Sequence, residues 1–379
     1  MVGPFDFSTA TKIVFGLGKI QSLPSLAKPL GKRALVVTGA NPARAVKALA
    51  GFAATYFSVP GEPTLAIVRE GVKAARGCDF LIGFGGGSAM DAAKAIAALV
   101  PNSGEPLDYL EVIGRGRPLE HSPLPFVTVP TTAGTGAEVT RNAVLGSPEH
   151  GLKASLRSPL LVARLALIDP DLTLETPAAV TASTGLDTLT QLIEPFVSCR
   201  ANPFTDLFCR EGLRLVVGAL PKAFRNGEDR EARAAMAFAS LLSGLSLANA
   251  GLGIVHGFAG PLGGLLNAPH GALCAAVLPH GMAVSIRALR ERASDPEALL
   301  KYRRVGQLLT GDSQAEAEDA VRFASDLCRS LTVSSLGAYG LERSQIPDLV
   351  AKVAIASSTK ANPIPLFTEE LAEIAERAL

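Results

Sequence analysis

The feature that most constrains the fold is one change of hydrophobic pattern along the chain. In the first part, short runs rich in β-branched residues alternate with helical segments, as in KRALVVTG followed by ANPARAVKALAG. This alternation favours a parallel sheet covered by helices on both faces. Further on, the sequence is rich in Ala and Leu at helical spacing, as in REARAAMAFASLLSGLSLANAG. We therefore predict an α/β dinucleotide-binding domain over residues 1–173 and an all-helical domain over residues 174–379.

Composition argues against several classes of protein. The 379 residues are 48% hydrophobic and carry a net charge of +1 without a basic stripe, so nucleic-acid binding is not expected. The long apolar stretch 244–263 is interrupted by Gly and Pro, which favours a buried helix over a membrane span. The N-terminus lacks the pattern of a signal peptide, and the five cysteines are scattered without CxxC spacing. We therefore expect a cytoplasmic protein with reduced thiols and no membrane partner.

A glycine-rich loop lies between a predicted strand and a predicted helix. In LIGFGGGSAMDAAKAIA, the turn consists of Gly85, Gly86, Gly87 and Ser88. Glycines let the backbone approach a pyrophosphate closely, and a helix N-terminus offers N–H groups and the positive end of its dipole. Ser88 can cap the helix and donate to a phosphate oxygen. The spacing differs from GxGxxG, so by itself the loop is either a phosphate site or a tight strand-to-helix turn.

A second loop supports the phosphate interpretation. The segment PTTAGTG follows another predicted strand and contributes Thr131, Thr132 and Thr135. Loops that follow parallel strands lie at the same carboxyl edge of a sheet, where open α/β folds bind their ligands. The two loops together predict a nucleotide cofactor at this edge.

Three side chains in the second part of the chain form a candidate metal site. Asp187 lies in TASTGLDTLTQLIEPF, and His256 and His270 lie fourteen residues apart in Gly-rich segments. A carboxylate and two imidazoles leave a coordination position open, as in most catalytic metal sites. Gln191 follows Asp187 by four residues and shares its helical face. Either histidine alone is more often a core or capping residue than a ligand, so the prediction depends on their joint occurrence with a nucleotide loop.

Longer segments resemble the group III, iron-containing alcohol dehydrogenases. They cover nearly the whole chain in order and at the family's spacing: GGGSAMDAAKAIA, PTTAGTGAEVT, ASTGLDTLTQLIEPFVS, VHGFAGPLGGLLNAPHGALCAAVLPHG and ANPIPLFTEELAEIAERAL. The resemblance implies the fold shared with dehydroquinate synthase, an α/β nucleotide-binding domain followed by an all-α domain. It also implies hydride transfer between NAD or NADP and a small alcohol, aldehyde or ketone whose oxygen lies on Fe²⁺ or Zn²⁺. A homodimer or higher homo-oligomer is expected.

The resemblance assigns roles to individual residues. Asp187, His256 and His270 match metal ligands and form the catalytic centre. Seven residues match cofactor-binding positions: Gly86, Gly87, Ser88, Asp91, Thr131, Thr132 and Lys153.

Two positions depart from the family's pattern. Most iron-dependent members have His where this chain has Gln191, and an amide oxygen is a weaker donor than imidazole. Many members have a second histidine near the nicotinamide where this chain has Gly260, so a proton relay there must use water or another group.

Other activities stay open at this point. Metal-independent maleylacetate reductases are related chains, and the weaker donor at Gln191 keeps that activity in view. Dehydroquinate synthase-like lyases share the architecture, but they need a basic cluster for a phosphorylated substrate, and the C-terminal motifs here are small and apolar. A non-enzymatic NAD-binding protein is a third class, against which the retained Asp187, His256 and His270 argue.

The end of the strand RALVVTG bears on the choice between NAD and NADP. It ends at Thr38 and Gly39, both predicted to contact the cofactor. NAD-specific sites commonly place a carboxylate there, which accepts the ribose 2′-OH and repels a 2′-phosphate. Family members that exclude NADP often have Asp at the position of Gly39, and the nearby Arg44 is a cation within reach of a 2′-phosphate. We expect NADP(H) to be accepted and slightly preferred.

Overall fold

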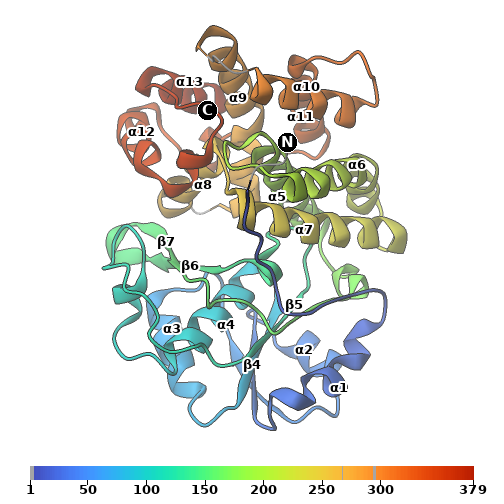
Figure 1. The fold of residues 1–379 in the computed structure, drawn as a ribbon, viewed down its shortest axis with the longest axis vertical. Helices are drawn as coiled ribbons and strands as arrows, with labels where there is room; N and C mark the ends of the chain where they lie inside the picture. Colours follow the sequence, from blue (N-terminus) through green and yellow to red (C-terminus); the bar gives the residue numbers. More distant parts are fainter. Residues whose placement is uncertain (1–3, 267, 293–295) are drawn as a thin grey trace. The chain divides into compact units, whose positions relative to one another are not determined.

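The computed structural model describes residues 4–266, 268–292 and 296–379. The chain divides into two compact units, drawn in Figure 1. One comprises Thr9–Thr176, and the other comprises Pro177–Leu379 together with the N-terminal segment that ends at Ser8.

The N-terminal segment packs on the helical unit, although the sequence pattern placed it with the first domain. The Phe5 and Phe7 rings make edge contacts with Phe204, with centroids 5.1 and 5.6 Å apart. Asn249 accepts a hydrogen bond from the Ser8 amide at 2.7 Å. Aromatic contacts between residues far apart in the sequence leave no trace in local periodicity, which is why the prediction missed them.

The α/β unit is built on a six-stranded sheet in the order β1-β8-β5-β4-β2-β3, and every neighbouring pair is parallel. The strands are β1 (Ile13–Phe15), β2 (Ala34–Thr38), β3 (Ala54–Ser58), β4 (Phe80–Gly85), β5 (Phe126–Pro130) and β8 (Leu165–Ile168). All residues of β2, β4, β5 and β8 are buried. Strands buried on both faces read as continuous apolar runs, and this explains why the sequence pattern identified them.

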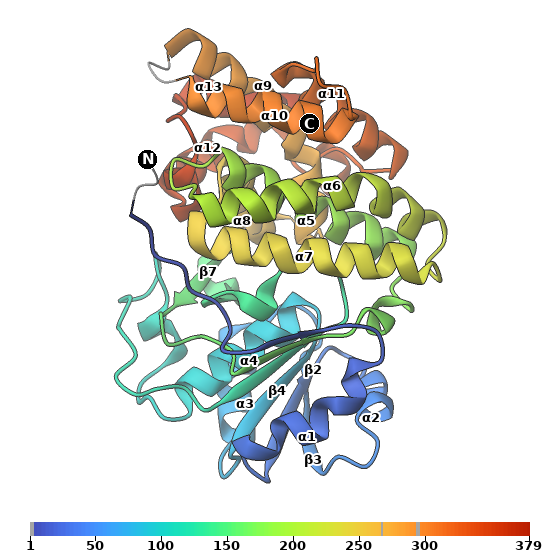
Figure 2. The same cartoon turned by 45° about the vertical axis from the view of Figure 1, so that its right-hand side comes forward.

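Helices cover both faces of this sheet (Figure 2). They are α1 (Leu23–Ala27), α2 (Ala43–Ala48), α3 (Leu65–Ala74) and α4 (Gly87–Leu99), with 3-10 turns η1 (Lys19–Ser22), η2 (Lys28–Leu30), η3 (Pro106–Tyr109), η4 (Ala137–Val139), η5 (Pro148–His150) and η6 (Pro170–Thr173). Ile82 of β4 packs with Leu23 and Ala45 from α1 and α2. The next residue, Gly83, faces α4 so closely that a Cβ there would lie 3.0 Å from the Ala93 methyl carbon. Alternation along the strand therefore assigns one face to α1 and α2 and the other to α4.

A two-stranded antiparallel hairpin, β6 (Asn142–Ser147) and β7 (Leu152–Arg157), is tied to α4. The fully buried Lys94 donates to Thr140 Oγ1 at 2.8 Å and to the Asn142 carbonyl at 3.0 Å. These bonds satisfy a buried ammonium that would otherwise be costly.

The helical unit is organised around α5, which is buried along most of its length and contacts α6, α7 and α9. The helices are α5 (Ala178–Val197), α6 (Pro203–Arg225), α7 (Arg230–Ala250), α8 (Ile254–Leu265), α9 (His270–Arg292), α10 (Glu297–Thr310), α11 (Ala317–Ser330), α12 (Ile346–Ile355) and α13 (Thr368–Ala378), with turns η7 (Gly337–Tyr339), η8 (Arg343–Gln345) and η9 (Ser357–Ala361). Asn202 begins α6 with a capping box, and the Asp229 side chain caps α7.

By length and composition, α9 could cross a membrane, and α7 with α8 would pass as a pair that is bent by 99°. The apolar window of α9 is 78% buried inside the protein, so packing within the unit accounts for its composition.

Candidate active site

Asp187, His256 and His270 come together inside the helical unit from α5, α8 and α9. Asp187 Oδ1 lies 3.3 Å from His256 Nε2 and 4.0 Å from His270 Nε2. Asp187 is 1% exposed and His256 is 7% exposed. The structure thus brings together the three side chains that the sequence selected.

Gly271 allows α9 to start close against α5. A Cβ at this position would lie 2.1 Å from the Ser183 carbonyl oxygen and 3.1 Å from Asp187 Cβ. No side chain fits at such distances, so the glycine lets the backbones approach and holds His270 beside Asp187.

Glu194, which the sequence analysis did not select, orients His256. Its Oε2 lies 2.6 Å from His256 Nδ1, and its Oε1 accepts the Val255 amide at 2.6 Å. Because a carboxylate only accepts, Nδ1 carries a hydrogen, so in the neutral imidazole the Nε2 lone pair is directed at Asp187. A carboxylate behind a ligating imidazole is the usual support of a metal-binding histidine. A buried acid two helical turns after Asp187 in an otherwise apolar segment was the available signal.

The facing atoms of Asp187 and His256 indicate whether a cation fits between them. Within the described chain, Asp187 Oδ1 and His256 Nε2 are both buried and have no hydrogen-bond partner. Two unshared electron pairs 3.3 Å apart in a buried site are unfavourable unless a positive charge lies between them. The arrangement fits a metal ion.

Cys274 is a fourth potential ligand that the sequence analysis missed. It follows His270 by one turn of α9, and its Sγ lies 3.7 Å from His270 Nε2. One donor atom from each of Asp187, His256, His270 and Cys274 falls within 4.8 Å of the others. The i,i+4 spacing from His270 was the signal for this residue.

The groups of the cluster stabilise one another's charged forms. Burial opposes a charge on His256 and His270, but Cys274 and the neighbouring carboxylates outweigh burial and raise the pKa values of both imidazoles. Burial opposes ionisation of Asp187, but its interaction with His256 and the charge of His270 outweigh burial and lower the pKa of this carboxyl. Burial likewise opposes ionisation of Cys274, yet the charges of His256 and His270 lower the pKa of its thiol. Metal ligation requires the carboxyl and the thiol without their protons and the imidazoles in their neutral form, so an ion that binds here displaces protons from the histidines.

Gln191 is buried on the same face of α5, and its Oε1 accepts a hydrogen bond from Ser243 Oγ at 3.0 Å. The same hydroxyl lies 2.8 Å from the Ser240 carbonyl, and an amide oxygen has two lone pairs, so this contact leaves the Gln191 oxygen able to bind a cation. Gly260 of α8 has space beside it, because a Cβ built there meets no described heavy atom within 4 Å.

In the α/β unit, the predicted phosphate loops lie against each other. Gly85 ends β4 with φ +155°, and its carbonyl accepts the Thr131 amide at 2.9 Å. A Cβ at Gly87 would lie 2.9 Å from Thr135 Cγ2, and one at Gly86 would lie 3.4 Å from Thr132 Oγ1. Gly85 is required by its backbone conformation and Gly87 by the close approach of the threonine loop to the start of α4, whereas a Cβ at Gly86 would make an ordinary contact.

The end of β2 adjoins these loops. A Cβ at Gly85 would lie 3.6 Å from the Gly39 amide nitrogen. The chain runs from β2 outward to β3 and then returns to β4 on the other side of β2, so the order of strands reverses between β2 and β4. Such a reversal is where open α/β sheets bind nucleotides, at the carboxyl ends of the strands.

The predicted capping role of Ser88 is wrong. Gly86 is the N-cap residue of α4, and Ser88 lies at the second helical position. The glycine run lets the helix begin earlier than a serine cap would allow. Thr38 Oγ1 donates to the Gly39 carbonyl at 2.9 Å, at the end of β2.

Asp91, Lys153 and Arg44 have protein partners in this structure. Asp91 Oδ2 accepts the Val144 amide at 3.1 Å, which joins α4 to β6. Lys153 Nζ lies 3.1 Å from a Glu62 carboxylate oxygen. Arg44 pairs with Glu175 at 3.1 Å and also donates to the Leu172 carbonyl. The Arg44 guanidinium, which the sequence suggested for a 2′-phosphate, is therefore held by residues 172 and 175.

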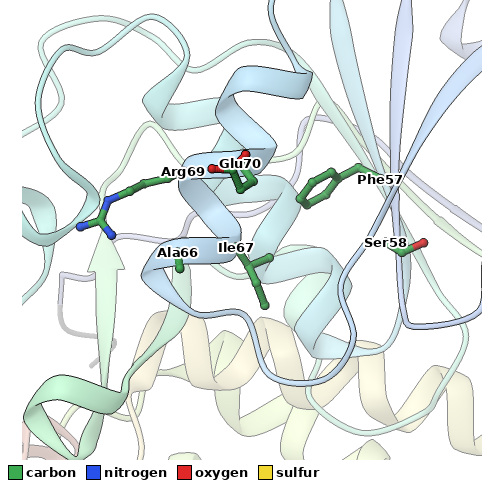
Figure 3. Close-up of a pocket in the computed structure, with 6 residues that line it drawn as sticks. All are labelled: Phe57, Ser58, Ala66, Ile67, Arg69 and Glu70. Atoms are coloured by element: carbon green, nitrogen blue, oxygen red, sulfur yellow. The ribbon is translucent and has the colours of Figure 1, made fainter.

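A hollow of about 370 Å³ also lies on the α/β unit (Figure 3). Residues of β3 and α3 line it: Phe57, Ser58, Ala66, Ile67, Arg69 and Glu70. None of the predicted site residues is among them, and Arg69 is paired with Glu105. This hollow is not part of the proposed chemistry.

Comparison with known proteins places the chain in the class of alcohol dehydrogenases. The family model described as "Iron-containing alcohol dehydrogenase" matches residues 10–170, and "Fe-containing alcohol dehydrogenase family, C-terminal" matches residues 181–379. The chain belongs to the iron-containing alcohol dehydrogenase family. The resemblance and the fold class predicted from the motifs are confirmed.

Individual relatives cover nearly the whole chain. The NAD-dependent methanol dehydrogenase of Bacillus methanolicus is 32% identical over 97% of each chain. The 1,3-propanediol dehydrogenase of Klebsiella pneumoniae is 32% identical over 99% of this chain and 98% of its own length. A solved archaeal alcohol dehydrogenase from a Red Sea brine pool superposes with a TM-score of 0.91 at 28% identity, over 100% of this chain and 99% of that one.

Proposed function

We propose that the protein is a metal-dependent, NAD(P)-linked alcohol dehydrogenase that also works as an aldehyde or ketone reductase. The observation that carries this proposal is the buried pair Asp187 Oδ1 and His256 Nε2, which face each other at 3.3 Å with no hydrogen-bond partner in the described chain. His270 lies beside them. This is a negative, preorganised site for one divalent ion.

The side chains divide the work at this centre. Asp187, His256 and His270 hold Fe²⁺ or Zn²⁺, with Gln191 proposed at or near a further position. A divalent cation supplies polarisation of the C–O bond in the alcohol or carbonyl compound. Glu194 keeps His256 in the tautomer that offers Nε2 to the ion, and the Asp187 carboxylate offsets part of the charge.

The cofactor is proposed at the switch point of the α/β sheet. The turn Gly85–Ser88 and the N-terminus of α4 receive the pyrophosphate. Further contacts are proposed from Thr38, Gly39, Asp91, Thr131, Thr132, Thr135 and Lys153. The nicotinamide supplies hydride chemistry. NAD is the cofactor in the name of the methanol dehydrogenase relative, and the missing carboxylate at Gly39 supports acceptance of NADP, with a slight preference for it.

The substrate class is proposed to be a small alcohol or its carbonyl product, as the names of the methanol and 1,3-propanediol relatives suggest. A cytoplasmic location is supported by five cysteines that form no disulfide within the described chain. Association into a homodimer or larger homo-oligomer is supported by apolar side chains exposed near the N-terminal segment, Phe204 at 46% and Leu207 at 60%.

The test removes the carboxylate. Asp187→Ala should abolish metal binding and alcohol-dependent NAD(P) reduction, measured by metal analysis and absorbance, while circular dichroism stays unchanged. Asp326→Ala, at an exposed aspartate of α11, is the matched control and should behave as the wild type. Full activity in metal-free protein or in Asp187→Ala would refute the proposal, and would favour metal-independent reduction of the maleylacetate reductase type.

A further inference from the structure

Cys274 lies in the proposed metal centre without a function assigned to it. The residue is fully buried, and α9 presents it on the same face as His270, one turn away. Its Sγ lies 3.7 Å from His270 Nε2 and belongs to the group of four donor atoms within 4.8 Å of one another.

The separations match the edges of a small coordination polyhedron. Zinc binds oxygen and nitrogen at about 2.0–2.2 Å and sulfur at about 2.3 Å, so tetrahedral ligand atoms stand roughly 3.3–3.6 Å apart. The observed distances are 3.3 Å from Asp187 Oδ1 to His256 Nε2, 3.7 Å from His270 Nε2 to Cys274 Sγ, and 4.0 Å from His270 Nε2 to Asp187 Oδ1. The other three separations are at most 4.8 Å, so shifts of up to about an ångström bring all four atoms onto one ion.

A second observation points independently to a cation at this place. Asp187 Oδ1 and His256 Nε2 are buried atoms with no hydrogen-bond partner in the part of the chain that the structure describes, and they face the same centre as the thiol. Cys274 is therefore a fourth donor at a place where the Asp187 and His256 atoms already require a positive charge.

We propose that the Cys274 thiolate is a protein ligand of the metal, giving one carboxylate, two imidazoles and one thiolate. This rests on the proposed function, since it concerns the same metal centre. The thiol proton passes to solvent when the metal–sulfur bond forms. Gln191 is the competing donor, but its neutral amide oxygen is a weaker ligand for Zn²⁺ than a thiolate.

The thiolate determines which ions the site prefers. Thiolates select soft or borderline ions, whereas carboxylate and carbonyl oxygens suit Mn²⁺ and Mg²⁺. The site therefore retains Zn²⁺ in strong preference to Mn²⁺. With these four side chains holding Zn²⁺, a substrate oxygen would be a fifth ligand, a number that zinc accommodates in some catalytic sites.

The experiment uses the full-length protein loaded with Co²⁺, which reports its ligands by absorption. Wild type should show a sulfur-to-cobalt charge-transfer band in the near ultraviolet in addition to the visible cobalt bands. Cys274→Ala should lose the charge-transfer band, keep the visible bands, and bind Zn²⁺ at least tenfold more weakly with little change for Mn²⁺. Cys274→Ser serves as a second variant if alanine impairs folding, and it should lose the same band.

Two controls identify the sulfur and the competing donor. Cys209→Ser removes another fully buried cysteine of the helical unit and should leave the band and the Zn²⁺ affinity unchanged. Gln191→Ala should also leave the band intact.

The outcomes separate this inference from the proposed function. Cobalt that binds in an Asp187-dependent manner without a charge-transfer band, or with a band that persists in both Cys274 variants, overturns the role of Cys274 and leaves the three-ligand site standing. Wild-type protein that binds no Co²⁺ or Zn²⁺ overturns both.

Discussion

The contact between Glu194 and His256 decides which nitrogen of the imidazole can bind a metal. The carboxylate accepts from Nδ1 at 2.6 Å while its other oxygen accepts the Val255 amide. Glu194→Gln keeps the size and the bond to Val255, but the amide then turns its NH₂ group toward Nδ1. Nδ1 becomes an acceptor, and the hydrogen moves to Nε2, where it blocks the lone pair.

Glu194→Gln should therefore weaken metal binding by about 10–100-fold, as loss of such supporting carboxylates does elsewhere. Competition with a chromogenic chelator measures the affinity, and the far-ultraviolet circular dichroism should not change. Glu228→Gln, at an exposed turn position before α7, is the control. Equal affinities in Glu194→Gln and wild type would show that this carboxylate does not select the tautomer.

At the scale of elements, the end of β2 lies beside the loop after β4, where the ribose of a nucleotide is proposed to sit. A Cβ at Gly39 meets no heavy atom of the described residues within 4 Å, so a side chain can be added without displacing protein. Arg44 is engaged by Glu175 and the Leu172 carbonyl, so the absent carboxylate at Gly39 carries the argument for NADP.

Gly39→Asp should shift the ratio of kcat/KM for NADP(H) to that for NAD(H) at least tenfold toward NAD(H), about 1.4 kcal/mol. The carboxylate accepts the ribose 2′-OH and repels a 2′-phosphate. Gly39→Ala adds a methyl group without charge and should leave the ratio near that of wild type. A wild type that prefers NAD(H) more than tenfold, together with an unchanged ratio in Gly39→Asp, would contradict the assignment.

The elements also show what the sequence could and could not predict. Strands buried on both faces and Gly-rich turns give strong local signals, so β2, β4 and the loop from Gly85 were predictable. The motifs selected Asp187, His256 and His270 for the same reason. Cys274 shares the i,i+4 spacing with His270, and Glu194 follows Asp187 by two helical turns. Both are common residue types in apolar helices, so only the packing of α5, α8 and α9 shows that they belong to the candidate site.

For the molecule as a whole, the division into two compact units means that the proposed metal ligands belong to one unit alone, with its own core. A ligand that binds only the folded state stabilises it by mass action, about 2.7 kcal/mol at a hundredfold excess over its Kd. Metal binding should therefore raise the free energy of unfolding of the helical unit and leave that of the α/β unit unchanged.

Removing the metal with a chelator should lower the Tm of the helical unit by roughly 5–10 °C, from that free energy and the usual response of units of about 200 residues. Circular dichroism measures the shift, and hydrogen exchange should rise in α5, α8 and α9 but not in β2, β4 and β5. Asp187→Ala should show no shift on chelation. If chelation speeds hydrogen exchange only in the sheet, the metal binds to the α/β unit and the assignment to the helical unit is wrong.

The glycine after His270 has a wider consequence. The carbonyl of Ser183 occupies the space that any side chain at position 271 would need. A single added methyl group would act as a wedge between α5 and α9, and it would move His270 and Cys274 away from Asp187 together. The spacing of the donor atoms therefore depends on the lack of a Cβ at Gly271, a residue that takes no part in binding. Adding one methyl group there would separate the donor atoms, although every ligand would still be present.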